Sequence, residues 1–396
     1  MSTDTRTANT RTTDTLVIGA GITGAAAALV LSEAGHRVTV VDAYGPAAMA
    51  SGWTLAGVRQ SGRHPAELPL ARAAVAQWAQ LDERLGRETG YRRSGNLRLA
   101  RSEDEIETIR ALVENQSAAG LPISWLGSLT EVREIAPHLS ERVLAASFCD
   151  SDGHADPVAT VTAFLERAGD LGATLRFGER VVRLRANAGR VTGVETDTAS
   201  YAPGTVILAT GILANDLLAP LGHRVPLRRP MVTVLRSTPT EPLLTPVLGV
   251  ANADMAARQE LSGRLRVTSG AEDWPGEIVE EAGRPAIRPR LRAIRETIEK
   301  VSSVLPAFAG LELEGVWAGA LDLTPDALPV LDRPEGLENL VVVAGFSGHG
   351  FGIGPVTGEI AARLACGETP DHDIAPFRLS RFRDDARESA PLTLHG

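Results

Sequence analysis

The stretch Asp14-Thr-Leu-Val-Ile-Gly-Ala-Gly-Ile-Thr-Gly24 decides the fold of this chain. An apolar run leads into Gly19, Gly21 and Gly24, which have the spacing G-x-G-x-x-G, and a run of alanine, valine and leucine follows at residues 25–31. This order predicts a strand, a tight turn and a buried helix. The first glycine permits the turn, the second admits a pyrophosphate to the backbone, and the third lets the helix pack closely on the strand. The N–H groups and the positive dipole end of this helix would then face the phosphates.

A second strand-like run at residues 37–42 ends on Asp42, eighteen residues after Gly24. The Asp42 carboxylate is therefore placed to hold the hydroxyls of an adenosine ribose. The alternative is a glycine-rich turn in an ordinary α/β unit that binds no nucleotide. A P-loop is excluded, because no lysine followed by serine or threonine comes after the turn. Together the two strands predict a dinucleotide-binding unit.

Composition indicates a globular protein with a sizeable core. The 396 residues suffice for two domains, 43% of them are hydrophobic, and the formal net charge of −9 argues against nucleic acid as a partner. The two cysteines, Cys149 and Cys366, are too few for a disulfide framework, and we expect both to be buried thiols in a reducing compartment. Residues 1–13 lack the apolar run of a secretory signal, so we expect a disordered tail and a cytoplasmic protein without a transmembrane segment.

Two long loops stand out. Residues 43–60 are mostly small, and Ser51 and Thr54 within them can donate hydrogen bonds, so we expect this loop to lie against a planar cofactor. The polar loop at residues 150–157 resembles a calcium loop, but Val161 stands where an EF-hand loop has its glutamate. We therefore expect no metal site.

The rest of the chain predicts two interleaved domains in an α/β fold. The apolar strand at residues 204–211 resumes the opening parallel sheet, whereas residues 221–315 contain prolines and alternating strands. A final strand and glycine-rich turn at residues 340–354 lead into a helix that ends near Cys366. We assign residues 14–90, 145–220 and 316–390 to a Rossmann-type domain. Residues 91–144 and 221–315 form a mostly antiparallel substrate domain.

Five motifs along the chain carry a family resemblance: Gly19-x-Gly21-x-x-Gly24 with Asp42, Ala50-Ser-Gly-x-x-x-x-Gly-Val-Arg-Gln60, Ala209-Thr-Gly211, Thr324-Pro-Asp-x-x-Pro329 and Gly345-Phe-Ser-Gly-His-Gly-Phe351. In this order they resemble the D-amino-acid-oxidase-like family of FAD-dependent amine and amino-acid oxidoreductases. The resemblance covers nearly the whole chain. It implies FAD, a bipartite fold like that of glutathione reductase, and oxidation of a C–N bond.

The resemblance also implies which residues hold FAD. The turn at residues 348–354 suits the negative charge that develops around flavin N1 and the C2 carbonyl, because backbone N–H groups can donate there. A glycine packing turn is the alternative. The residues expected to contact FAD are Gly19, Gly21, Ile22, Thr23, Gly24, Asp42, Ala43, Ser51, Gly52, Thr54, Ala56, Gly57, Val58, Val182, Thr210, Gly211, Gly348, His349, Gly350, Phe351, Gly352 and Ile353.

An amino-acid substrate needs a group that holds its carboxylate, and the planar fork of arginine does this best. Arg59 and Arg63 fall near a pair of arginines in sarcosine oxidase, and His64 stands beside them. Surface arginines are the alternative. His349 can contact flavin or substrate, or serve only as a structural hydrogen-bonding residue.

Three departures from the family refine these expectations. Residues 317–324 contain neither the substrate-binding arginine of glycine oxidase nor the flavin-linked cysteine of monomeric sarcosine oxidase, so we expect non-covalent FAD. Gly352 stands where the sarcosine enzyme has a lysine that assists oxygen reduction. That glycine favours a dehydrogenase that passes electrons to a quinone or a partner protein over an oxidase. The sequence of residues 350–355 most resembles that of opine-oxidase-type subunits, which work with partner chains.

We therefore expect hydride removal from the α-carbon of a small amino acid or secondary amine, giving an imine that water hydrolyses. Two alternatives stay open. One is an FAD-dependent 2-hydroxy-acid dehydrogenase, which needs a base for the hydroxyl proton, such as His64 or His349. The other is a flavoprotein subunit that is active only in a larger complex.

Overall fold

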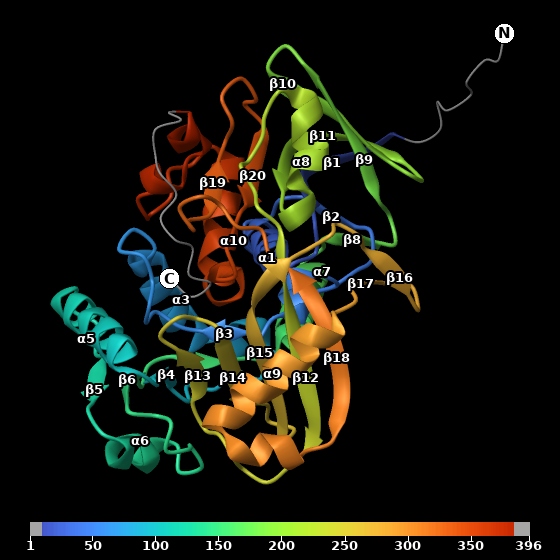
Figure 1. The fold of residues 1–396 in the computed structure, drawn as a ribbon. Coiled ribbons are helices and arrows are strands. Elements are labelled where there is room, and N and C mark those ends of the chain that lie inside the picture. Colours follow the sequence, from blue (N-terminus) through green and yellow to red (C-terminus); the bar gives the residue numbers. More distant parts are fainter. Residues whose placement is uncertain (1–9, 384–396) are drawn as a thin grey trace.

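The opening stretch lies at the centre of a mixed sheet in the upper half of the molecule (Figure 1). The structure, a computed structural model, describes residues 10–383. Neighbouring strands from β20 to β8 pair in parallel, whereas β19 and the β9–β10 hairpin join antiparallel. In spatial order the strands are β19 (Val330–Asp332), β20 (Leu340–Ala344), β11 (Ser200–Leu208), β1 (Thr10–Ile18), β2 (Val38–Asp42) and β8 (Thr174–Phe177), with β10 (Arg190–Thr196) on β11 and β9 (Val181–Asn187) on β10.

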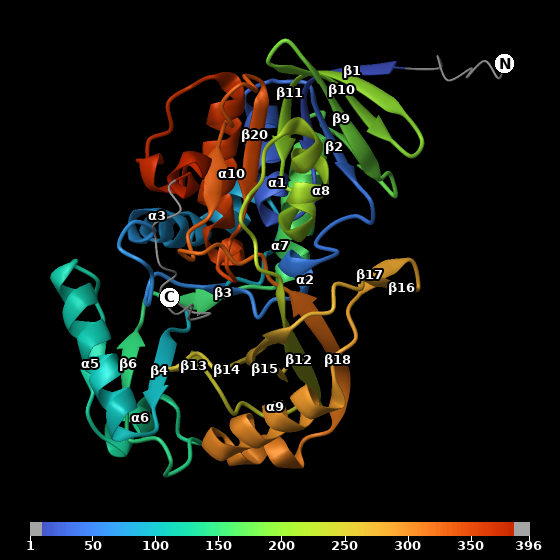
Figure 2. The same cartoon turned by 45° about the horizontal axis from the view of Figure 1, so that its top comes forward.

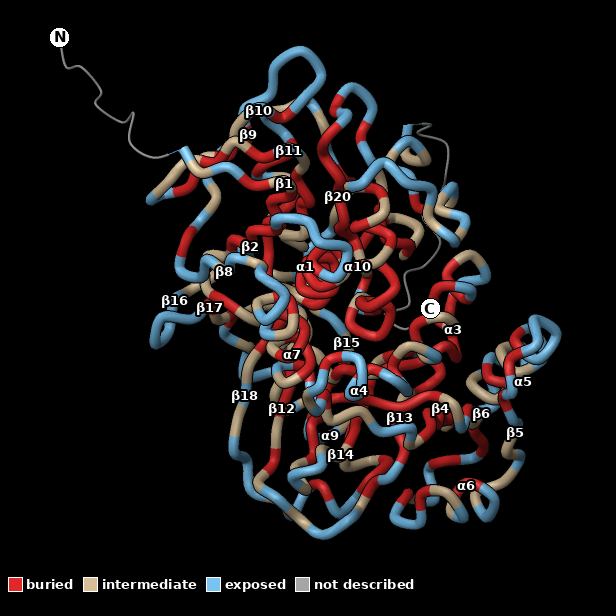
Figure 3. Tube along the Cα trace, turned by 180° about the vertical axis from the view of Figure 1, so that it is seen from behind, coloured by how far each residue is buried: buried red, intermediate tan, exposed pale blue. Residues whose placement is uncertain are grey.

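Helices cover one face of this sheet. Because side chains alternate along a strand, Val17 faces the helices, whereas Leu16 and Ile18 face the hairpin and α8 (Ala214–Leu218). Helix α1 is buried along nearly its whole length (Figure 3) and packs on α10. The two helices approach closely at Gly358 of α10, where a Cβ would overlap the Cβ of Ala26. The helices on this face are α1 (Ile22–Glu33), α3 (Leu68–Trp78), α4 (Leu81–Leu85), α7 (Pro157–Asp170) and α10 (Gly350–Cys366).

A second sheet forms the lower half of the molecule. It is antiparallel except for the parallel pair β13 and β4. Helix α9 (Leu291–Val304) covers its face away from α1 and α10 (Figure 2), while α5 (Glu103–Ala118) and α6 (Leu129–Ile135) pack near its far edge. In spatial order the strands are β18 (Leu313–Ala320), β12 (Pro230–Pro239), β15 (Arg264–Asp273), β14 (Met255–Gln259), β13 (Val247–Val250), β4 (Asn96–Ala100), β6 (Ala145–Cys149) and β5 (Ser124–Leu126).

Short elements connect the two halves. Strand β3 (Gly57–Val58) pairs with β7 (Gly153–His154). Helix α2 (Ala50–Trp53) precedes β3 in the long loop of residues 43–60. A small hairpin of β16 (Val279–Glu281) and β17 (Arg284–Ala286) projects from the second sheet. No helix in residues 10–383 is long and apolar enough to span a bilayer.

The α/β fold with two interleaved sheets is confirmed, but several boundaries are corrected. Strands β6 and β18 belong to the second sheet, although we assigned residues from 145 and from 316 to the Rossmann-type domain. Strand β1 starts at Thr10, so residues 10–13 are not a tail: they pair with Ser200–Pro203 of β11. The remainder of that expected tail, residues 1–9, and residues 384–390 of the expected Rossmann-type domain lie outside the described residues.

Candidate functional site

Two adjoining cavities of about 390 and 230 Å³ lie between the sheets, at the carboxyl ends of β1, β2 and β11. Ligands of doubly wound folds bind at this edge of the parallel sheet. Gly21, Ser51, Trp53, Gly211 and Asp322 line both cavities, so the two form one elongated cleft. We call its larger part the nucleotide end and its smaller part the substrate end.

The dinucleotide turn has the form that the glycine spacing predicts. Gly19 has φ of +111°, and a Cβ there would overlap the carbonyl oxygen of Ala209. A Cβ on Gly24 would overlap the carbonyl oxygen of Gly19. Gly21 is the N-cap residue of α1 and has no side chain with which to cap the helix. Ser51 Oγ, from the following loop, accepts a hydrogen bond from Ile22 N at 3.0 Å. A helix start that lines a cleft in this way fits a pyrophosphate.

The nucleotide end has the hydrogen-bonding groups and the apolar surface that an adenosine needs. The Asp42 carboxylate is fixed by backbone N–H groups of Ala20 at 2.8 Å and Tyr44 at 2.7 Å. Val182 lines the cleft and is 54% exposed, and the buried Thr210 Oγ1 has no hydrogen-bond partner among the described residues. An apolar residue left open and a hydroxyl left unpaired fit a ligand in this cavity.

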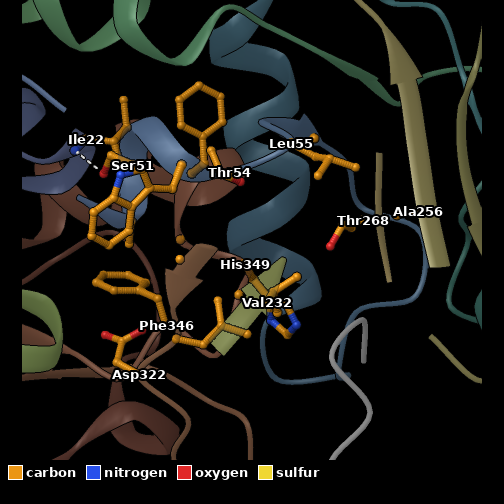
Figure 4. A pocket seen from close by; sticks show the side chains of 18 of the residues that line it. Ile22, Ser51, Thr54, Leu55, Val232, Ala256, Thr268, Asp322, Phe346 and His349 are labelled. Carbon is orange, nitrogen blue, oxygen red and sulfur yellow. Dashed lines mark hydrogen bonds between the residues drawn. The ribbon is translucent and has the colours of Figure 1, made fainter. Parts of the chain in front are cut away.

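A buried carboxyl that the sequence analysis missed supports the glycine turn after β20. Asp322 Oδ2 accepts a hydrogen bond from Gly345 N at 2.7 Å, and its backbone carbonyl accepts one from Ser347 N at 3.1 Å. Burial outweighs these backbone donors and raises the pKa of Asp322 to about 6. Asp322 lines both cavities, so it fixes the glycine turn at the point where the two cavities join. Figure 4 shows its carboxyl group beside Phe346.

Three buried arginines, Arg59, Arg63 and Arg98, line the substrate end. Burial lowers the pKa of each guanidinium, that of Arg98 to about 10, but arginine stays protonated at neutral pH. Their carboxylate neighbours are Glu67, with Oε1 3.5 Å from Arg63 Nε, and Asp152, which accepts a hydrogen bond from Gln60 N at 2.8 Å. Burial raises the pKa of Asp152, and with both acids ionised the three guanidinium groups and two carboxylates leave one net positive charge. Arg63 Nη1 is buried and has no hydrogen-bond partner among residues 10–383, so a carboxylate fits here.

His349 is the N-cap residue of α10 and also lines the substrate end. Its Nδ1 lies 3.3 Å from Glu67 Oε2, and its Nε2 is buried without a hydrogen-bond partner in the described part of the chain. Burial and the charge of Arg63 lower the pKa of His349 to about 4. The imidazole is therefore neutral at pH 7.

The second sheet, which also carries Arg98, supplies most of the apolar wall of the substrate end. Figure 4 shows Val232 next to the His349 ring, with Ala256 and Leu55 further along the cavity. Two hydroxyl-bearing residues, Thr268 and Ser269, also line it. The walls are therefore mainly aliphatic and suit a small apolar substituent.

Most of the sequence-predicted residues come together in this cleft, but some do not. His64 is exposed, its Nδ1 accepts a hydrogen bond from Ala66 N at 3.1 Å, and it lines neither cavity. Gly352 packs behind the cleft, with its carbonyl oxygen accepting from Trp78 Nε1 at 2.7 Å. The predicted cofactor residues that line neither cavity are Gly52, Ala56, Val58, Gly352 and Ile353.

Comparisons with known proteins agree with this geometry. A family model described as FAD dependent oxidoreductase matches residues 14–364. Glycine oxidase from Bacillus licheniformis is 29% identical over 379 residues, which cover 93% of this chain and 97% of that protein. 4-Methylaminobutanoate oxidase (formaldehyde-forming) from Paenarthrobacter nicotinovorans is 27% identical over 93% of this chain, which spans only 45% of that longer protein. The solved structure of L-proline dehydrogenase from P. horikoshii superposes with a TM-score of 0.86 at 27% identity, covering 95% of this chain and 99% of that one.

Proposed function

Because the chain belongs to the FAD-dependent oxidoreductase family, we propose that it oxidises the CH–N bond of a small apolar amino acid or secondary amine. Its relatives are named as oxidases and dehydrogenases of such compounds, among them glycine, L-proline and 4-methylaminobutanoate. FAD bound in the cleft supplies a two-electron acceptor that takes hydride from carbon. The chain's own residues must bind the cofactor, hold the substrate and manage its protons.

We assign the nucleotide end of the cleft to the adenosine and the pyrophosphate, held by Asp42 and the start of α1. The turn before α10 then faces the flavin, with Gly348 at φ of +87° exposing backbone in the substrate end.

The observation that carries this proposal is the arginine cluster beside the glycine turn. A buried cluster with an excess of positive charge, whose Arg63 Nη1 has no hydrogen-bond partner among the described residues, recognises a carboxylate. Aliphatic residues of the second sheet, such as Val232 and Ala256, offer an apolar surface to the rest of the substrate. Together these features select a small amino acid with one carboxylate.

We propose a dehydrogenase, because no lysine lies near the cleft to assist oxygen reduction. The chain contains one lysine, Lys300, which is on α9 and pairs with Asp254 on the far face of the second sheet. Position 352 also has little room for a side chain, because a Cβ there would lie 2.9 Å from the carbonyl oxygen of Gly57.

The test compares turnover with an artificial dye acceptor and with oxygen, for matched amino acids and 2-hydroxy acids. We expect fast dye reduction with an amine and slow oxygen consumption. Equal rates with oxygen would identify an oxidase instead. The unpaired His349 Nε2 also suits a hydroxyl proton, so turnover of hydroxy acids alone would favour the second candidate, a 2-hydroxy-acid dehydrogenase.

We also predict that FAD is bound without a covalent link. Cys149 is buried in β6, where burial raises the pKa of its thiol to about 12, and Cys366 is exposed at the end of α10, contrary to our expectation of two buried thiols. Neither lines the cleft. Acid precipitation of the holoprotein should therefore release all flavin into the supernatant. A yellow pellet after washing would show a covalent bond.

A further inference from the structure

We propose that Glu67 and His349 act as a pair that takes the ammonium proton from the bound substrate before oxidation. This inference rests on the proposed function, the oxidation of an amino acid or amine. Such a substrate has a protonated nitrogen when it binds at neutral pH. A protonated nitrogen has no lone pair with which to stabilise the cation that forms as hydride leaves the α-carbon. Some group in the substrate end must therefore remove that proton.

Glu67 and His349 come from different elements and meet in the interior. Glu67 is the N-cap residue of α3 and is 0% exposed, and His349 begins α10. The two carboxylate oxygens have separate neighbours: Oε2 lies 3.3 Å from His349 Nδ1, and Oε1 lies 3.5 Å from Arg63 Nε. Glu67 thus connects the imidazole to the arginine cluster.

This contact determines which imidazole nitrogen carries the proton. Although burial alone would raise the pKa of Glu67, the charges of His349 and Arg63 hold it at about 2, so the carboxylate can only accept a hydrogen bond. The proton of the neutral imidazole therefore lies on Nδ1. Nε2 is left with a free lone pair, buried in the wall of the substrate end and without a donor among the described residues.

The charges around His349 explain how it would take a proton only when substrate is bound. Arg63 and Arg59 lower its pKa and Glu67 raises it, and with burial the value is about 4, so the empty site holds a neutral base at pH 7. A substrate carboxylate on the arginines offsets their charge and raises the pKa of His349. The ammonium N–H bond then breaks, a bond forms between that proton and Nε2, and the electron pair stays on the substrate nitrogen. The Glu67 carboxylate balances the new imidazolium charge.

The test is the Glu67→Gln variant, which keeps the shape of the side chain and removes its charge. Its rate of flavin bleaching by substrate, measured anaerobically in a stopped-flow instrument, should fall about 100-fold at pH 7. The rate should recover towards that of the wild type as the pH rises and the amine loses its proton to solvent. Glu67→Asp should restore part of the rate at pH 7.

Glu359→Gln is the matched control, because Glu359 lies on α10 and accepts from Gln77 on α3 at 3.0 Å, outside the cleft. It should keep the pH profile of the wild type. A Glu67→Gln rate that is reduced equally at every pH, or not reduced, would overturn the inference. If no amine bleaches the flavin of the wild-type protein, the proposed function fails instead.

A second measurement does not depend on catalysis. In ¹⁵N-histidine-labelled wild-type protein at pH 7, NMR should show the His349 signal, assigned by its loss in His349→Gln, with a proton on Nδ1 and none on Nε2. A proton on Nε2 at pH 7 would contradict the proposed pair. Addition of an unreactive carboxylate should raise the pH at which this ring titrates.

Discussion

Replacing Arg63 by alanine should raise the KM for the amino-acid substrate about 100-fold, since truncating one partner of a buried charge pair costs about 2–5 kcal/mol. Arg63 lines the substrate end, and its Nη1 has no hydrogen-bond partner within the described part of the chain. We expect Arg63→Lys to recover only part of the loss, because an ammonium cannot form the two parallel hydrogen bonds of a guanidinium. Steady-state kinetics with a dye acceptor would measure both effects.

Arg93→Ala is the matched control for this substitution. Arg93 is an exposed arginine whose ion pair with Asp150 spans 3.5 Å at the surface, so its removal should leave KM unchanged. The flavin absorbance spectrum of each variant would verify that the cofactor site is intact. An unchanged KM in Arg63→Ala with normal flavin content would remove Arg63 from the substrate site.

The Gly24→Ala variant is expected to lose FAD and much of its stability. The new Cβ would overlap the Gly19 carbonyl oxygen and come within 3.3 Å of Val17 Cγ1, so α1 must move away from β1. Such overpacking costs about 1–3 kcal/mol or more, and here it also displaces the helix start that faces the pyrophosphate. Thermal unfolding and the ratio of flavin to protein absorbance would measure the two losses.

Gly310→Ala serves as the control, because a Cβ at Gly310 meets nothing within 4 Å. Its melting temperature and flavin content should match those of the wild type. Wild-type flavin content in Gly24→Ala would show that this close approach of helix and strand is not needed for cofactor binding.

The dinucleotide unit was predictable because each of its glycines meets a local requirement that the spacing alone reveals. Sheet membership was harder to predict. The short sequences of β6 and β18 do not indicate which sheet they join, and only their long-range partners, such as β12 for β18, place them in the second sheet. Likewise, residues 10–13 are polar and become a strand only because β11 lies beside them.

The substrate site shows the same limit. Arg98 alternates with Leu97 and Leu99 as a half-exposed strand residue would, but β4 is buried on both faces and Arg98 turns into the cleft. His64 follows Arg63 in the sequence, yet the chain turns into α3 there. In the turn that precedes Leu68, Arg63 meets Glu67 while His64 points to solvent.

The most direct test of the account is an anaerobic absorbance titration of the FAD-loaded protein with small amino acids, secondary amines and the matching 2-hydroxy acids. We predict that the visible absorption band of the flavin bleaches with at least one apolar amino acid or secondary amine that carries a single carboxylate. It should not bleach with the corresponding hydroxy acid. A flavin band that no amine bleaches, or that only hydroxy acids bleach, would contradict the proposed oxidation of a CH–N bond.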